Sequence, residues 1–198
     1  MIGVLILAGG KGQRMGGQDK GWCSKNKESF IETVLRQFQQ QAEQLKPLEI
    51  IIVISANRNI ADYSGLGYPV ISDIRPGYCG PLAGVEAAMH ESSLSNVTRW
   101  IMWPVDSLKV PDDYLSKMSE PIQEVCFLKQ QQRSHYAHLS IPNTLKDSLS
   151  SYLDAQKFSI KGWLQSLSKK ESNVTEIEFP EQAPILNCNQ TFIRGNKA

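Results

Sequence analysis

Residues 3–20 read GVLILAGGKGQRMGGQDK, and this stretch decides the fold class. Its first five residues, 3–7, form a short continuous apolar run, which is typical of a strand buried on both faces of a parallel sheet. The following segment, 8–20, holds five glycines and two basic residues before Asp19, so it predicts a loop. The chain therefore begins with a buried strand that runs directly into a glycine-rich loop.

A helix and a second strand are predicted next. Apolar residues recur at helical spacing between Phe30 and Leu45, and Pro47 follows them. Residues 50–54, IIIVI, indicate a second buried strand. Strand, loop, helix and strand in this order form a βαβ unit, whose crossover we expect to be right-handed.

The alternation of strands and helices continues along the rest of the chain, without internal repeats or linkers. We predict strands at 69–72, 99–105, 124–128, 138–141 and 175–179, and helices at 82–90, 145–155 and 161–167. The pair at 124–128 and 138–141 could be antiparallel. One α/β domain that spans residues 1–198 accounts for the whole pattern.

Composition and charge exclude several classes of protein. The chain has 198 residues, 41% of them apolar, which suits one globular domain. Its 21 basic and 20 acidic side chains argue against a nucleic-acid binder that depends on counterion release. The apolar run at the amino terminus is too short for a signal peptide or a membrane helix, so we expect a cytoplasmic protein without membrane contact. The four cysteines lie far apart without a C-x-x-C pair, and we expect free thiols.

The glycine-rich loop has the composition of a phosphate-binding site. Loops at the carboxyl ends of strands are where open α/β sheets bind ligands, and glycines let backbone N–H groups approach phosphate oxygens. Lys11, Arg14 and Lys20 supply positive charge for a triphosphate. The loop is not a Walker loop, because Gln18 stands where lysine is required, and Met15 interrupts the dinucleotide fingerprint.

Residues 7–20 resemble the signature loop of nucleotidyltransferases. The form L-A-G-G followed by R-M-G-G-x-D-K is similar to that of the molybdenum cofactor guanylyltransferases, the MobA family. The resemblance implies a Rossmann-like three-layer sandwich of the nucleotide-diphospho-sugar transferase type, with a mostly parallel sheet and some antiparallel strands. It also implies transfer of GMP from GTP to the phosphate of molybdopterin, with release of pyrophosphate. Residues 1–110 would then bind the nucleotide and residues 111–198 the acceptor.

Other segments resemble motifs of the same family in the same order. Residues 55–58, SANR, are similar to N-A-N-R, with Ser55 in place of the first asparagine. Residues 69–73 and 80–84 resemble V-I-x-D and G-P-L-A-G. From its own position alone, Asp73 could equally be a helix cap or a turn residue. The resemblance implies GTP contacts by Leu7, Ala8, Gly9, Gly10, Lys20, Ser55, Asn57, Asp73 and Asp106.

Asp106 is the candidate metal ligand. It follows the strand predicted at 99–105, and a carboxylate at the carboxyl end of a strand beside a phosphate loop can hold Mg²⁺. Residues 103–108, WPVDSL, resemble the family's C-P-x-D-x-P but lack its final proline. A simple solvated strand end is the alternative interpretation. We assign catalytic roles to Asp106, to Lys20 at the α-phosphate, and to Arg14 at the β- and γ-phosphates.

The acceptor side carries fewer matching residues. The segment 133–135 resembles the family's R-x-H. His135 and His138 stand three residues apart, but no third ligand is evident, so zinc is not expected. Asn187 and Asn189 match the family's N-x-N, which implies contacts with molybdopterin, although the T-P-E that follows in the family is absent. The resemblance also suggests other molybdenum-cofactor assembly proteins and apo-molybdoenzymes as partners.

Two alternatives remain open at this point. The chain could be a related nucleotidyltransferase with another base or acceptor, cytidylyl or sugar-phosphate, or a non-catalytic GTP-binding regulator. In every catalytic version two anions must be brought together, so charge neutralisation and in-line positioning are the main requirements. No strong general base is needed, because a phosphate monoester with a second pKa of about 6 is already ionised near neutral pH.

Overall fold

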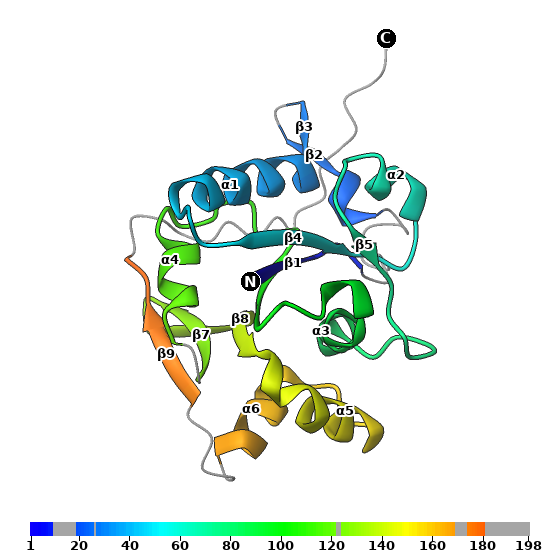
Figure 1. Ribbon diagram of the computed structural model, residues 1–198, viewed down its shortest axis with the longest axis vertical. Helices are drawn as coiled ribbons and strands as arrows, with labels where there is room; N and C mark the ends of the chain where they lie inside the picture. Colours follow the sequence, from blue (N-terminus) through cyan, green and yellow to red (C-terminus); the bar gives the residue numbers. More distant parts are fainter. Residues whose placement is uncertain (10–18, 26, 122–123, 169–173, 181–198) are drawn as a thin grey trace.

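The computed structural model of the protein describes residues 1–9, 19–25, 27–121, 124–168 and 174–180. A seven-stranded sheet crosses the molecule in the order β5-β4-β1-β6-β8-β7-β9, with helices on both of its faces (Figure 1). Its strands are β1 (Ile2–Leu7), β4 (Ile50–Ser55), β5 (Val70–Ile71), β6 (Arg99–Pro104), β7 (Val125–Gln130), β8 (Arg133–Pro142) and β9 (Val174–Glu178). A separate two-stranded hairpin consists of β2 (Ser24–Lys25) and β3 (Glu28–Ser29).

The sheet is mostly parallel. Strand β1 is parallel to both of its neighbours, β4 and β6, and β4 is parallel to β5. Strand β8 is antiparallel to β6 and β7, whereas β9 is parallel to β7. The predicted mostly parallel sheet with some antiparallel pairing is therefore confirmed. Because β8 runs against its neighbours, its first residues lie toward the same end of the sheet as the carboxyl ends of β1 and β6.

Helices cover the two faces as the predicted three-layer sandwich requires. Helices α1, α2 and α4 lie on one face, and α3, α5 and α6 lie on the other (Figure 1). Their bounds are α1 (Phe30–Gln44), α2 (Ile60–Ser64), α3 (Pro81–His90), α4 (Tyr114–Ser119), α5 (Lys146–Asp154) and α6 (Ile160–Ser168). The described residues also form the short 3-10 helices η2 (Lys20–Trp22), η3 (Ser92–Leu94) and η4 (Asn143–Leu145). No helix in this described part of the chain is long and apolar enough to cross a membrane.

Alternating side chains of the central strands build two cores. In β1, Val4 and Ile6 pack into the core beneath α1, whereas Leu5 packs into the core beneath α3. In β6, Trp103 joins the first core and Trp100 joins the second. All five side chains are fully buried. Burial on both faces explains why the first strand has an unbroken apolar sequence.

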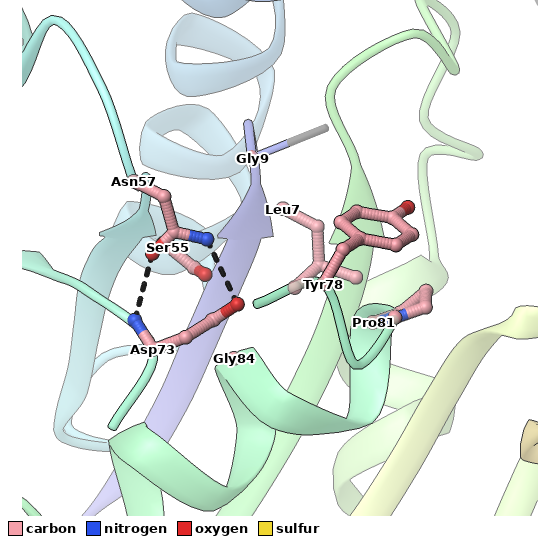
Figure 2. A pocket seen from close by; sticks show the side chains of 9 residues that line it. Leu7, Gly9, Ser55, Asn57, Asp73, Tyr78, Pro81 and Gly84 are labelled. Atoms are coloured by element: carbon pink, nitrogen blue, oxygen red, sulfur yellow. Dashed lines mark hydrogen bonds between the residues drawn. The ribbon is translucent and has the colours of Figure 1, made fainter. Parts of the chain in front are cut away.

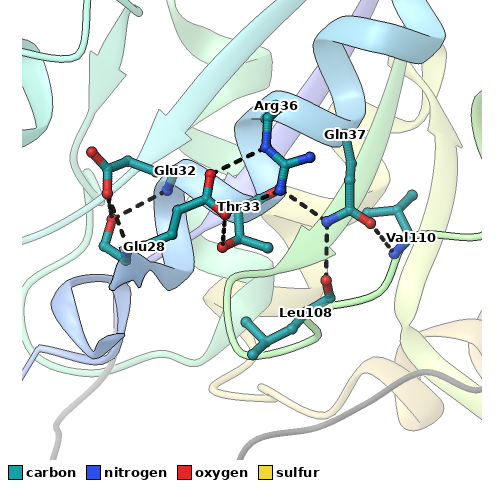
Figure 3. A network of polar contacts seen from close by, with 8 residues as sticks. Glu28, Glu32, Thr33, Arg36, Gln37, Leu108 and Val110 are labelled. Carbon is teal, nitrogen blue, oxygen red and sulfur yellow. Dashed lines mark hydrogen bonds and ion pairs between the residues drawn. The ribbon is translucent and has the colours of Figure 1, made fainter. Parts of the chain in front are cut away.

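Helix α1 begins with a capping box and then fixes the segment that follows β6. The Ser29 and Glu32 side chains each accept a hydrogen bond from the other's backbone N–H. Further along the helix, the Gln37 amide donates to the carbonyl of Leu108 at 3.0 Å and accepts from the backbone N–H of Val110 at 3.0 Å (Figure 3). One glutamine thereby holds the chain two to four residues beyond Asp106.

Candidate active site

A pocket opens at the carboxyl ends of β1, β4 and β5, where doubly wound sheets bind their ligands (Figure 2). It is lined by Leu7, Gly9, Ser55, Asn57, Asp73, Tyr78, Gly80, Pro81 and Gly84. Five of these nine residues were predicted to contact GTP: Leu7, Gly9, Ser55, Asn57 and Asp73. The fold thus brings together residues from three separate segments of the sequence.

Backbone hydrogen bonds between β1 and β4 fix the position of the pocket residues that follow β1. Leu7 is in register with Ser55, and the N–H groups of Ala8 and Gly9 both donate to the Ser55 carbonyl, at 2.9 and 3.0 Å. The Ala8 side chain is buried in the core beneath α1, so it points away from the pocket. The predicted contribution of Ala8 to nucleotide binding would therefore be limited to its backbone.

Asn57 and Asp73 form a doubly hydrogen-bonded pair at the pocket. The Asn57 amide donates to the Asp73 carboxylate at 2.8 Å, and its oxygen accepts from the Asp73 backbone N–H, also at 2.8 Å (Figure 2). Burial raises the pKa of the Asp73 carboxyl, and the hydrogen bond from Asn57 opposes this rise. The pairing sets the orientation of both polar groups before any ligand arrives.

Ser55 lies deeper than the sequence suggests. It is only 4% exposed, and its hydroxyl packs against Gly84 of α3. A Cβ added to Gly84 would lie 2.5 Å from Ser55 Oγ and 3.3 Å from Leu7 Cδ2, so only glycine fits here without displacement. Gly84, the second glycine of the G-P-L-A-G stretch, therefore allows α3 to pack closely against Ser55 and Leu7 at the pocket.

Tyr78 is a pocket residue that the sequence interpretation missed. It is 51% exposed and projects over the pocket from the loop that precedes α3 (Figure 2). The loop is anchored by Arg75, which makes two hydrogen bonds to the buried Glu86 carboxylate at 2.6 and 2.7 Å and an ion pair with Asp154. The sequence feature that could have indicated Tyr78 is its position as an aromatic residue in a glycine-containing loop directly before the G-P-L-A-G stretch of residues 80–84.

Lys20 and Asp106 meet beside this pocket. Lys20 Nζ lies 2.7 Å from Asp106 Oδ2, and both side chains are partly exposed. Lys20 begins η2 at the end of the glycine-rich loop, and Asp106 follows β6, the neighbour of β1. Two residues assigned catalytic roles from the sequence, 86 positions apart, are thus in direct contact.

Asp19 holds the end of the glycine-rich loop in place. Its carboxylate accepts hydrogen bonds from the Gly21 backbone N–H at 3.1 Å, the Tyr63 hydroxyl at 2.7 Å and the Asn59 amide at 3.0 Å. Burial and the hydrogen bond to Asp19 both raise the pKa of Tyr63, so the phenol remains a donor. This network fixes the backbone next to Lys20. The sequence showed Asp19 only as part of the matched motif.

Four predicted site residues, Gly10, Arg14, Asn187 and Asn189, lie outside the described residues.

On the acceptor side, His135 is partly buried near the start of β8, and its ring lies 5.8 Å from that of His138. Burial lowers the pKa of His135, with Arg133 adding to the effect. In the part of the chain that the structure covers, no three His, Cys, Asp or Glu side chains are grouped as a metal site.

Comparison with known proteins identifies the family. The MobA-like NTP transferase domain matches residues 4–171. A molybdenum cofactor guanylyltransferase from Shewanella woodyi is 34% identical over 192 residues, covering 95% of this chain and 91% of the relative. Another from Haemophilus influenzae is 33% identical over 156 residues, 77% of this chain and 76% of the relative.

Solved structures confirm the fold. Molybdopterin-guanine dinucleotide biosynthesis protein A from Archaeoglobus fulgidus superposes with a TM-score of 0.60 at 18% identity, over 91% of this chain and 84% of that one. The inositol-1-phosphate CTP transferase from T. maritima gives 0.68 at 13% identity, over 91% and 86%. At these identities the likeness establishes the fold alone. The sequence matches show that the chain belongs to the MobA-like NTP transferase family.

Proposed function

We propose that this protein transfers GMP from GTP to the phosphate of molybdopterin, forming molybdopterin guanine dinucleotide and pyrophosphate. The observation that carries the proposal is the Lys20–Asp106 contact beside the Asn57–Asp73 pocket, in a chain whose relatives are named guanylyltransferases. A basic group for phosphates and a pre-oriented polar pocket for a base stand at the same end of one sheet. This is the arrangement that nucleotidyl transfer needs.

The pocket suits a guanine base. Guanine offers N–H donors on one edge and the O6 and N7 acceptors on another. The Asp73 carboxylate can accept from such donors, and Asn57 can both donate and accept. Backbone groups of residues 7–9 would border the base from the β1 side, with the buried Ser55 beneath it.

The reaction requires charge neutralisation more than proton transfer. An oxygen of the acceptor phosphate attacks the α-phosphorus of GTP and forms a new P–O bond. The bond between the α-phosphorus and the bridging oxygen breaks, and pyrophosphate leaves with that electron pair. Lys20 would neutralise charge that builds up on the α-phosphoryl oxygens, and Arg14 would hold the β- and γ-phosphates.

The residues present fit a Mg²⁺ cofactor. Mg²⁺ in nucleotide sites is usually held by one or two carboxylates together with substrate phosphates, and it needs no cage of protein ligands. The Asp106 carboxylate is partly exposed and already forms an ion pair with a cationic group, with Lys20 Nζ 2.7 Å from Asp106 Oδ2. Asp106 would hold the ion, which when bound neutralises phosphate charge and orients the leaving group.

The second half of the chain would bind the acceptor. Arg133 and His135 begin β8 at the end of the sheet where Asp106 lies, a position from which they can reach an incoming phosphate. Asn187 and Asn189 are proposed to contact the pterin on the basis of the sequence resemblance. Other cofactor-assembly proteins and apo-molybdoenzymes are the proposed partners for delivering the acceptor and receiving the product.

Pyrophosphate release by the pure protein tests this function. The protein is incubated with Mg²⁺, molybdopterin and GTP, CTP or ATP in turn, with Asp106→Asn as the inactive control. Release with GTP alone is expected. Release with CTP instead would assign a cytidylyltransferase, and GTP binding without any release would favour a regulator built on the same fold.

A further inference from the structure

Side-chain contacts hold the segment that carries Asp106, in addition to the backbone hydrogen bonds from Val105 N–H to the Leu7 carbonyl and from Ser107 N–H to the Pro104 carbonyl. Residues 106–108 contain no proline whose ring would restrain the backbone. Gln37 holds the downstream end of the segment through the carbonyl of Leu108. Closer to Asp106, the backbone carbonyl of Ser107 accepts a hydrogen bond from the Trp103 indole at 2.8 Å.

His138 of β8 makes a further contact to this segment. Its Nε2 lies 3.0 Å from Ser107 Oγ, within hydrogen-bond distance, and both residues are buried. The Trp103 ring packs edge-on against the imidazole, with ring centroids 4.4 Å apart. Trp103 and His138 thus hold Ser107 by its carbonyl and its hydroxyl, directly beside the candidate metal ligand.

Apolar packing alone does not explain a histidine at this position. Burying a polar ring costs free energy unless the ring is hydrogen-bonded, and a leucine would fill the space without that cost. Burial lowers the pKa of His138 to about 3, so the ring is neutral at physiological pH. A neutral imidazole keeps its hydrogen bond to Ser107 without placing a second positive charge near Lys20 and the phosphates.

We propose that His138 is a positioning residue, which fixes Ser107 and thereby holds the Asp106 carboxylate ready for a divalent cation. The inference rests on the proposed function, because that function makes Asp106 the metal ligand. His138 has no part in bond making or breaking. Its effect is expected in metal affinity more than in the rate at saturating metal, as for other residues that orient metal ligands.

The test measures metal binding directly, with Mn²⁺ as the probe because it takes the same oxygen ligands as Mg²⁺. Loss of the EPR signal of free Mn²⁺, beyond the loss caused by the same concentration of GTP without protein, is followed for the wild type, His138→Leu and Ser107→Ala. Both variants should bind Mn²⁺ about tenfold more weakly. His138→Gln, which can keep an amide near Ser107, should recover most of the loss.

His90→Leu is the matched control. His90 Nε2 lies 3.1 Å from Ser150 Oγ, so the same kind of pair is removed at the far end of α3 from the pocket. This control should leave Mn²⁺ affinity unchanged. A double variant of His138 and Ser107 should lose no more affinity than either single variant, because both remove one contact.

The outcomes separate this inference from the proposed function. If His138→Leu and Ser107→Ala only lower the melting temperature and leave Mn²⁺ affinity intact, His138 is a core residue and the inference is wrong. If wild-type protein binds Mn²⁺ with GTP but releases no pyrophosphate, the transferase proposal fails while the shift in Mn²⁺ affinity still tests His138. If wild-type protein binds no Mn²⁺, both are overturned.

Discussion

The two sides of the candidate site are held in place by different means. On the nucleotide side, Leu7 and Gly9 take their positions from backbone hydrogen bonds between neighbouring parallel strands. On the metal side, backbone hydrogen bonds of Val105 and Ser107 are supplemented by side chains that are distant in sequence. Lys20 contacts Asp106 directly, and His138 acts through Ser107. Removing a long-range side-chain contact should therefore disturb the metal side, whereas the nucleotide side should also respond to added volume where α3 packs against Ser55 and Leu7.

Replacing Lys20 by alanine should have the largest effect. We expect Lys20→Ala to lower the rate of pyrophosphate release about 10²–10³-fold, because one charge that stabilises the transition state is lost. The melting temperature should change little, since a partly exposed ion pair contributes about 0–1 kcal/mol. Lys46→Ala, which removes an exposed pair with Glu43, is the control. Unfolding of Lys20→Ala would show that Lys20 has a structural role instead.

The hydrogen bonds of Asp19 that fix the backbone next to Lys20 can be tested by a substitution of Tyr63. Removing the hydroxyl in Tyr63→Phe leaves the buried Asp19 carboxylate without a 2.7 Å donor, which should lower the free energy of unfolding by about 1.5–3 kcal/mol. Chemical denaturation measures this directly. Tyr152→Phe removes an exposed hydroxyl contact to a backbone carbonyl and should cost far less. Equal losses in the two variants would contradict the anchoring role of Asp19.

The nucleotide side should respond to added volume. Gly84→Ala places a methyl group 2.5 Å from Ser55 Oγ, and overpacking of this kind should destabilise the protein by about 1–2 kcal/mol and weaken GTP binding. Isothermal titration and thermal melting measure both effects. The double variant Ser55→Ala/Gly84→Ala makes room for the methyl group and should recover most of the loss. Failure to recover would place the strain elsewhere.

Most of the fold could be predicted from the sequence because its elements have strong local patterns. The apolar run of β1, the β-branched run of β4 and the amphipathic stripe of α1 each specify their structure within a few residues. Helices α2 and α4, with 5 and 6 residues, were not predicted, because so few residues cannot show a helical period.

Candidate site residues could be proposed from the sequence where they stand in a contiguous motif. Lys20, Asn57, Asp73 and Asp106 could be proposed as candidates because each stands in a recognisable sequence motif that follows a strand. The residues that hold these side chains in place were not predicted, because they act in pairs that are distant in sequence and come into contact only in the folded chain. His138 and Ser107 are 31 positions apart, and nothing in the sequence near either one indicates the other.

The smallest predicted effect concerns pH and tests whether His138 is neutral in the folded state. The pKa of its imidazole falls from 6.5 to about 3 on folding, because burial disfavours the charged form and His135 lies nearby. Below pH 6.5 the unfolded chain therefore binds a proton that the folded chain does not. Stability is lost as the pH falls, by about 1 kcal/mol between pH 6.5 and 5.5.

His138→Leu isolates this contribution. Denaturation curves at the two pH values should show a smaller loss of stability in the variant than in the wild type, by about 1 kcal/mol. The other histidines and the carboxylates titrate in both proteins, so they cancel in the difference. Identical pH dependence would mean that His138 ionises near its ordinary pKa in the folded protein. A charged ring could not remain buried against Trp103 and Ser107, so that result would also remove the contact on which the metal side depends.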